Sequence, residues 1–476
     1  MTPSPPSSVA PNLDRKSFLI GTGALATASL FPRRAQAASP TIIRAEKRVI
    51  EVHGKSASVF GLRQPDGTSG LITDVSTPFR VRLENASGRK TLVHWHGLTP
   101  PYRQDGVPYV SAPPVATGES AEYDFPLTFG GTYWMHSHQD FQEQQLMVAP
   151  LIIRDPADRA ADEHEIIVLL HDFSFRAPEE IFASLRAAKT AMPGMAMPGM
   201  AMSGMGPDLN DVSYDAFLAN ERTLDDPQIV RVEPGGRVRL RIINGASASN
   251  FALDLGALTG QLIAVDGHAV APLRGSTFPI AMAQRIDLRV QLPRGQGAFP
   301  ILATLEGERA RTGIVLATAH ARVAKIATLA ADAAPALGLG LEHQLRGAKP
   351  LAPKVADRVH RIDLTGTMEG YQWSLNGTPY PHAEPFHVAA GERVELVLRN
   401  TTMMSHPMHL HGHVFQVVAI DGRRFSGARR DTVLVPPKTA LTIAFDADNP
   451  GTWLFHCHNL YHMISGMMGT VVYDRA

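Results

Sequence analysis

The chain has 476 residues, more than one ordinary hydrophobic core accommodates, and this length suits two to four domains. Its 45 basic and 45 acidic residues give a formal net charge of zero, so bulk electrostatics does not indicate binding to nucleic acid or to an anionic membrane. The single cysteine, Cys457, excludes an intramolecular disulfide. Its thiol is either an inert core group or a reactive or metal-binding one, and the histidines on both sides of it favour metal binding.

The N-terminus has the pattern of an export signal. A polar stretch that ends in Arg15 and Lys16 precedes a mildly apolar run over residues 20–31, and small residues around Ala37 offer a cleavage site. The pattern is similar to a twin-arginine signal, which exports folded cargo, although Lys16 replaces the second arginine. We therefore predict a signal over residues 1–37 and an exported, periplasmic protein. The apolar run is too short and interrupted to span a membrane, so we expect no stable membrane insertion.

Two blocks of sequence near the ends of the chain repeat each other. Residues 131–138 and 451–458 share one pattern, with Ser137 in the place of Cys457. The middle of the chain shares another pattern with the C-terminal part: residues 236–244 match 391–400 with one residue of slack. Internal repeats of this kind indicate related structural units.

Apolar and polar residues alternate within these repeats, as at Val238, Leu240 and Ile242, which is the period of half-buried strands. Gly and Pro, 76 residues in total (40 and 36), separate short β-rich runs. We predict an all-β fold of three consecutive antiparallel β-sandwich domains. The predicted boundaries are 38–157 for the first domain, 158–325 for the second, 326–355 for a linker and 356–476 for the third.

Histidines cluster in four short motifs. Eleven of the 20 histidines lie in these motifs, and the motifs occupy equivalent places in the first and last repeats. One pair of the form His-x-His is easily a surface feature of a strand, but four such pairs at equivalent places indicate metal binding. The eleven are His94, His96, His136, His138, His406, His409, His411, His413, His456, His458 and His462.

Strand geometry predicts what the motifs do. Residues i and i+2 of a strand face the same side, so His456 and His458 point one way and Cys457 points the other. A thiolate, two imidazoles and a weak thioether form the ligand set of a blue copper site that transfers electrons. Cys457, His406 and His462 supply this set together with either Met467 or Met468. Eight histidines of the four pairs then remain, which suits three metal ions, and His413 is expected to belong to the strand that follows.

The four motifs resemble those of the multicopper oxidases, the laccase-like family in its three-domain form, over nearly the whole mature chain. The resemblance implies cupredoxin-like Greek-key domains and four copper ions: one type 1, one type 2 and two type 3. It also implies one-electron oxidation of a donor coupled to four-electron reduction of dioxygen to water. The family spacing favours Met467 as the thioether ligand. It assigns His94 and His409 to type 2 copper and His96, His136, His138, His411, His456 and His458 to the type 3 pair.

Proton delivery is predicted for Asp105, and Cys457 is the other residue predicted to be catalytic. Asp105 follows the first histidine pair and matches an acidic position that the family uses near type 2 copper. The alternative is an ordinary turn aspartate before Gly106. Many relatives also carry an acid within or just after the last motif, but residues 457–472 contain none.

The donor is predicted from a methionine-rich insertion over residues 190–206. Spaced thioethers suit cuprous ion, and similar segments occur in family members that oxidise Cu(I) in copper resistance. We therefore predict Cu(I) as the donor and a monomeric enzyme. The alternatives are an inert flexible insertion, a laccase acting on phenols or aromatic amines, and a non-catalytic cell-envelope protein on the same scaffold. The predicted Cu(I) contacts are Met192, Met195, Met197, Met200, Met202, Met205 and Met404.

Overall fold

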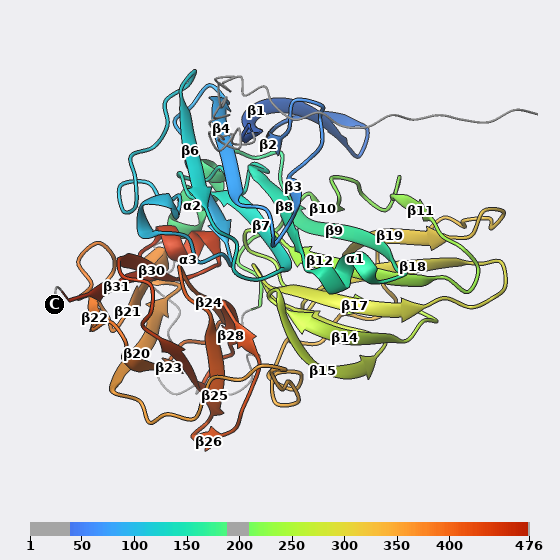
Figure 1. The fold of residues 1–476 in the computed structure, drawn as a ribbon. Coiled ribbons are helices and arrows are strands. Elements are labelled where there is room, and N and C mark those ends of the chain that lie inside the picture. The colour runs from blue at the N-terminus through green and yellow to red at the C-terminus, as the bar shows by residue number, and fades with distance from the viewer. Residues whose placement is uncertain (1–38, 188–208, 475–476) are drawn as a thin grey trace, which may run out of the picture. The chain divides into compact units, whose positions relative to one another are not determined.

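The computed structural model describes residues 39–187 and 209–474, and β-strands dominate both ranges (Figure 1). The predicted export signal and the methionine-rich insertion lie outside the described residues. Within the described ranges, every helix is too short or too polar to cross a membrane.

The first group of strands forms two sheets whose facing side chains share one hydrophobic core. Ile43 and Val81 of one sheet and Trp95 and Tyr133 of the other are fully buried in it. One sheet has the order β2 (Lys55–Arg63), β1 (Thr41–Val52), β4 (Phe79–Ala86) and β6 (Ser120–Phe125). The other has the order β3 (Leu71–Asp74), β8 (Val148–Arg154), β7 (Gly131–Ser137) and β5 (Val93–His96).

A second pair of sheets follows, after the short helix α1 (Pro156–Ala160). Its core contains the alternating residues Val238, Leu240 and Ile242 that the sequence predicted for a strand. One sheet has the order β10 (Ala216–Ala219), β9 (His164–Phe173), β12 (Arg237–Asn244), β17 (Arg285–Gln291), β14 (Gly260–Val265) and β15 (His268–Gly275). The other has the order β11 (Ile229–Arg231), β19 (Arg311–Ala317), β18 (Ala298–Leu305), β13 (Phe251–Asp254) and β16 (Thr277–Ile280).

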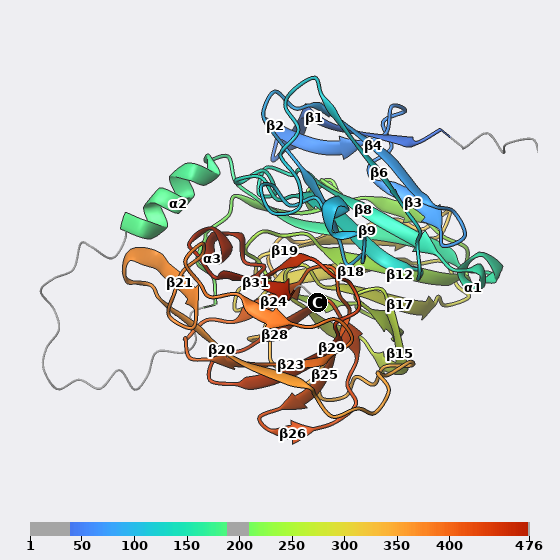
Figure 2. The same ribbon diagram turned by 60° about the vertical axis from the view of Figure 1, so that its left-hand side comes forward.

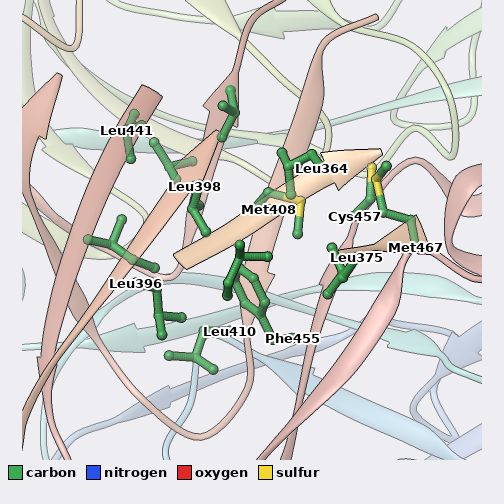
Figure 3. Packing of buried hydrophobic residues seen from close by; sticks show 14 of the residues in the cluster. Leu364, Leu375, Leu396, Leu398, Met408, Leu410, Leu441, Phe455, Cys457 and Met467 are labelled. Atoms are coloured by element: carbon green, nitrogen blue, oxygen red, sulfur yellow. The ribbon is translucent and has the colours of Figure 1, made fainter. Parts of the chain in front are cut away.

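The last pair of sheets encloses the hydrophobic cluster that contains Cys457 and Met467 (Figure 3). One sheet has the order β21 (Gln372–Leu375), β20 (Arg358–Thr367), β23 (Arg393–Asn400), β29 (Ala440–Asp446), β25 (Phe415–Ile420) and β26 (Arg423–Arg424), and β27 (Arg429–Arg430) pairs with β25. The other has the order β22 (Phe386–Val388), β31 (Met468–Tyr473), β30 (Thr452–Cys457), β24 (His406–Leu410) and β28 (Thr432–Val435).

The remaining elements are short. The helix α2 (Pro178–Ala187) lies near α3 (Leu460–Ile464) and β21 (Figure 2), and its Phe182 packs against Tyr371 and Tyr461. Two single turns of 3-10 helix, η1 (Tyr102–Gln104) and η2 (Glu369–Tyr371), complete the set of helices in the described ranges.

The three pairs of sheets repeat one topology. Each sheet is antiparallel except for one parallel pair, and the parallel pairs recur at equivalent places: β1 with β4, β9 with β12 and β20 with β23 in one layer. The pairs β3 with β8, β11 with β19 and β22 with β31 recur in the other layer. The predicted all-β class with repeated sandwiches is confirmed. The residue boundaries between the predicted domains stay a prediction.

Details of the turns support the repeats that were recognised in the sequence. Asp266 (φ 47°) and Asp421 (φ 47°) each precede a glycine of positive φ, which is the backbone of a tight hairpin turn. A β-bulge lies just before each turn, between Leu262 and Ala264 and between Val417 and Ala419. The same turn and the same bulge therefore recur in the second and third pairs of sheets.

A buried asparagine fixes an equivalent loop in each of the three pairs of sheets. The side-chain amides of Asn85, Asn244 and Asn400 each donate to two backbone carbonyl oxygens at 2.7–3.3 Å. Each amide thereby ties its own loop to a second segment of the chain, at Val115, Ile280 and Val435 respectively. The loops lead into β5, β13 and β24. Two of these strands carry histidine pairs, and β13 carries none.

Candidate metal centres

Neighbouring strands bring the histidine motifs side by side. His94 of β5 lies opposite His136 of β7, and His409 of β24 lies opposite His456 of β30. Each ladder therefore presents two motifs to the same space. The predicted direction of the side chains follows from this pairing, because alternate residues of a strand share one face.

Eight histidines from the first and last pairs of sheets meet in one buried cluster, which we call the histidine cluster. Each of its subgroups combines residues from both ends of the chain, with candidate ligand atoms within 4.8 Å of one another. The subgroups are His94, His96 and His409; His96, His136 and His458; and His138, His411 and His456.

The spacing of the ring nitrogens suits metal ions. The Nε2 atoms of His94 and His409 lie 3.4 Å apart, and those of His411 and His456 lie 3.0 Å apart. Two imidazole nitrogens that each lie about 2 Å from one metal ion are about 3–3.5 Å apart. The Nε2 atoms of His138 and His458 are buried and lack a hydrogen-bond partner in the described structure, which also fits a bound cation.

Burial favours the neutral form of three imidazoles of the histidine cluster. It lowers the pKa of His138 and His411 well below the usual range, and neighbouring imidazoles lower it further. It lowers the pKa of His456 to about 3. The ring nitrogens therefore keep free lone pairs at neutral pH, as metal ligation requires.

A second centre lies around the sulfur atom, and we call it the sulfur site. The Sγ atom of Cys457 is 3.7 Å from Nδ1 of His406 and 3.6 Å from Nδ1 of His462, and the two Nδ1 atoms are 3.2 Å apart. Burial raises the pKa of the Cys457 thiol, so a thiolate there needs a cation beside it.

The methionine that faces the sulfur site is Met467 rather than Met468. Met467 is fully buried in the same hydrophobic cluster as Cys457, and its carbonyl oxygen accepts a hydrogen bond of 3.0 Å from the Cys457 amide. Figure 3 shows the two side chains next to each other. Met468 is only partly buried and begins β31. The environment therefore favours Met467 as the thioether ligand.

The predicted acid Asp105 contacts one histidine from the N-terminal pair of sheets and one from the C-terminal pair. Its Oδ1 atom is 3.2 Å from Nδ1 of His94, and its Oδ2 atom is 2.9 Å from Nδ1 of His411. The next residue, Gly106, has a φ of 83°, and a Cβ atom there would lie 1.8 Å from the carbonyl oxygen of Val93. The glycine thus lets the loop that carries Asp105 approach β5 closely.

Two further acids at the centres were not predicted from the sequence. Glu143 is buried with Oε2 2.8 Å from Nδ1 of His136 and Oε1 3.7 Å from Nδ1 of His458. Burial, followed by the charge of Asp172, raises the pKa of Glu143 well above its usual range. This carboxyl group stands near the last motif, which has no acid of its own. Its position seven residues after His136 was the only signal in the sequence, and spacing alone does not show where a loop turns.

The second unpredicted acid is Asp211, which follows the methionine-rich insertion in the chain. Its Oδ2 atom is 2.8 Å from Nε2 of His462, and the Tyr371 hydroxyl donates to the same oxygen at 2.5 Å. The side chain of Asp211 is fully buried, and its Oδ1 atom lacks a hydrogen-bond partner within the described ranges. A carboxylate therefore faces the side of His462 that points away from the sulfur.

Two further residues that the sequence singled out lie near the centres. Met404 is 4% exposed and packs in the hydrophobic cluster, whereas its neighbour Met403 is 44% exposed. His413 lies in the connection before β25, not in the strand, and bonds to Tyr473 through Nε2. Of the predicted Cu(I) contacts, Met404 alone lies in a described range.

Comparisons with known proteins agree with this geometry. Three family models, each described as multicopper oxidase, match residues 70–158, 165–324 and 355–476. The chain is 32% identical to "Multicopper oxidase MmcO" of Mycobacterium tuberculosis over 413 residues, which cover 81% of this chain and 77% of that protein.

Other similar proteins differ in their named roles. The chain is 27% identical to a "Copper resistance protein A homolog" of Pseudomonas syringae pv. tomato, with 82% of this chain and 85% of that protein covered. It is 29% identical to "Laccase-2" of Botryotinia fuckeliana, with 80% and 73% covered. Among solved structures, Fet3p, described as a multicopper oxidase that functions in iron import, has the same fold, with a TM-score of 0.75, 21% identity and coverage of 91% and 90%.

Proposed function

Because the chain belongs to the multicopper oxidase family, whose members hold four copper ions in cupredoxin-like domains, we propose that it oxidises Cu(I) with dioxygen as the acceptor. When bound, the coppers take up electrons singly from the donor and deliver four of them to dioxygen, which becomes water. The three family matches support a division into three domains near residues 157 and 325. We also propose that residues 1–37 direct export and that the enzyme serves copper tolerance.

The proposed ligands follow the two centres. The close approach of Cys457, His406 and His462 supports a type 1 site completed by Met467. The pair His94 and His409 supports a type 2 site. All the ligand positions are occupied by suitable side chains, which argues against a copper-free scaffold protein. The six histidines proposed for the type 3 pair are His96, His136, His138, His411, His456 and His458.

The chain itself connects the centres. Cys457 belongs to the sulfur site, while its neighbours His456 and His458 belong to the histidine cluster. The backbone of three consecutive residues, 456–458, therefore joins the two centres covalently. For proton delivery we propose Asp105, because its carboxylate contacts both His94 and His411 and stands between the proposed type 2 and type 3 ligands.

One observation supports a cationic donor: the buried carboxylate of Asp211 bonds to His462. His462 is a proposed type 1 ligand, and its Nε2 atom, which bonds to Asp211, lies on the ring edge that faces away from the sulfur. The Oδ1 atom of Asp211 has no hydrogen-bond partner among the described residues, and the negative charge of this carboxylate attracts a cation more strongly than a neutral phenol. His462 is fully buried, and the centroid of the Trp373 ring lies 4.0 Å from that of its imidazole, so neither a cation nor a phenol contacts the imidazole directly, and the preference for a cation comes from the charge of Asp211.

Two further features agree with Cu(I) as donor. The methionine-rich insertion ends at residue 206, shortly before Asp211 in the sequence, and the exposed Met403 adds a thioether close to His406 in the chain. The burial of Met404 favours a core role for that side chain. The laccase reading stays as the alternative, because a laccase is also among the similar proteins.

The test compares two donors in two matched variants. Asp211→Asn removes the charge at His462, while Asp215→Asn removes an exposed carboxylate four residues further along the chain. We expect Asp211→Asn to lower kcat/KM for Cu(I) about tenfold, the effect of about 1.4 kcal/mol, and to change that for 2,6-dimethoxyphenol much less. Asp215→Asn leaves both unchanged.

The comparison of donors separates the loss of a cation-attracting charge from a general change in the type 1 copper site. A change in the reduction potential of the type 1 site affects both donors, whereas loss of a cation site affects Cu(I) alone. Equal losses for Cu(I) and the phenol, or no oxidation of Cu(I) by the unmodified enzyme, would contradict the proposed donor.

A further inference from the structure

A buried ion pair joins the middle of the chain to the histidine cluster. Arg285, at the start of β17, donates from Nη1 to Oδ1 of Asp431 at 2.7 Å and from Nη2 to Oδ2. The two side chains are 0% and 1% exposed. Arg285 belongs to the pair of sheets that contributes no histidine to the cluster, and Asp431 directly precedes β28 in the last pair.

Asp431 contacts one histidine from each end of the chain. Its Oδ1 atom is 3.0 Å from Nε2 of His96, and its backbone carbonyl oxygen is 2.8 Å from Nδ1 of His409. The Thr432 hydroxyl lies 3.1 Å from Nε2 of His96 and 3.2 Å from Nδ1 of His409. One short segment therefore bonds to the outer ring nitrogens of two proposed ligands.

These contacts decide which ring nitrogen faces the metal. Because Nε2 of His96 bonds to Asp431, its Nδ1 atom is left to face the cluster, where it lies 3.4 Å from Nε2 of His136. The opposite holds for His409, whose Nδ1 bonds to Asp431 and whose Nε2 faces His94. Partners on the outer nitrogen fix the tautomer and the ring orientation of a metal ligand.

Arg285 is itself held on several sides. It donates from Nε to the Thr132 carbonyl oxygen at 3.1 Å and from Nη1 to the Ala283 carbonyl oxygen at 3.0 Å. Gly97, the residue after His96, packs directly on the ion pair: a Cβ atom there would lie 2.5 Å from Nη2 of Arg285 and 2.7 Å from Oδ2 of Asp431. The guanidinium thus fixes both the position and the rotation of the carboxylate.

We propose that Arg285 is a positioning residue for the trinuclear copper cluster: it holds the Asp431 carboxylate so that His96 and His409 present the correct nitrogens to copper. The ligand-free middle pair of sheets then has a defined part in the copper site beyond spacing the other two. This inference rests on the proposed ligand roles of His96 and His409, and it is independent of the donor.

The test uses Arg285→Lys, which keeps the positive charge but loses the two-pronged contact with the carboxylate. Arg239→Lys is the matched control. Arg239 belongs to the same sheet and is also buried, and its guanidinium donates to Asp287 at 2.7 Å and 3.1 Å. Both variants weaken a buried ion pair at the junction with the first pair of sheets, where Asp287 accepts from Thr132.

The readouts are copper content after dialysis against a chelator, the visible absorption of type 1 copper and the electron paramagnetic resonance spectrum of type 2 copper. We expect Arg285→Lys to retain copper in the cluster roughly tenfold more weakly and to shift the type 2 spectrum, because outer partners of ligands have effects of this size. The type 1 absorption stays intact. Arg239→Lys keeps all four coppers and an unchanged spectrum.

A second variant keeps the test decisive if Arg285→Lys does not fold. Thr432→Val removes the hydroxyl that bonds to both outer nitrogens and leaves no buried charge unpaired, and we expect it to shift the type 2 spectrum in the folded protein. Full copper retention with an unchanged type 2 spectrum in folded Arg285→Lys, equal effects of both lysine variants, or an unchanged spectrum in Thr432→Val would each overturn the proposal. Failure of Cu(I) as donor leaves these spectra unaffected, so the two hypotheses are tested separately.

Discussion

The copper-free protein should lose stability in acid, and the contribution of one residue, His413, can be worked out. His413 is buried, is not among the proposed ligands, and bonds through Nδ1 to the His411 carbonyl oxygen at 3.0 Å and through Nε2 to the Tyr473 hydroxyl at 2.6 Å. Burial lowers its pKa to about 4. The unfolded chain has the ordinary histidine pKa of about 6.5.

The direction of the pH dependence of stability follows from proton uptake. Below pH 6.5 the unfolded chain binds a proton that buried His413 does not take up, so the stabilising contribution is complete above pH 6.5 and is lost as the pH falls towards 4. Between pH 7.5 and 5.0 the loss covers about 1.5 pH units below the unfolded-state pKa. At about 1.36 kcal/mol per unit, this amounts to about 2 kcal/mol.

The assay is urea unfolding of copper-free protein at pH 7.5 and pH 5.0, followed by fluorescence of the four tryptophans. In His413→Gln, the decrease in unfolding free energy between these pH values should be about 2 kcal/mol smaller than in the unmodified protein. His382→Gln, at an exposed position, controls for the loss of a histidine as such. Equal pH dependence in the unmodified protein and His413→Gln would refute the reasoning.

Two predictions concern the copper sites and the donor. His409→Ala should impair oxygen reduction and weaken the type 2 spectrum while the blue absorption stays, because the sulfur site is built from other side chains. The measurements are absorption and oxygen uptake. Loss of both signals in a folded variant would count against the proposed division of ligands. Replacement of the six methionines of residues 192–205 by leucine should lower turnover of Cu(I) and leave phenol oxidation unchanged or raised, because thioether sulfur prefers cuprous ion. Unchanged Cu(I) kinetics would mark the segment as an inert insertion.

Much of the fold and of the ligand set was predictable because short motifs impose both residue type and spacing. The pairs His94 and His96, and His456 and His458, lie on or at the end of strands, and alternation along a strand fixes their common direction. The Asp-Gly pairs at residues 266–267 and 421–422 can also be read in the sequence, and such a pair is typical of a tight hairpin turn with positive φ at both residues.

The partners of the ligands were not predictable, because they come from distant parts of the chain. Arg285 meets Asp431 across 146 residues, and Asp211 meets His462 across 251. An isolated buried arginine or aspartate has no periodic pattern, and its partner is decided by how the sandwiches pack. Glu143 is similar: the loop after β7 folds back on His136, which no local propensity indicates.

The measurement that tests the central claim most directly is the visible spectrum and oxygen uptake of copper-loaded protein, compared with Cys457→Ser. The thiolate of Cys457 is the only one the chain can offer to copper. The unmodified protein should be intensely blue and consume dioxygen with a reducing donor. Cys457→Ser, folded to the same extent, should be colourless and nearly inactive while it keeps copper in the histidine cluster. A blue Cys457→Ser variant, or a colourless unmodified protein with full copper, would contradict the account.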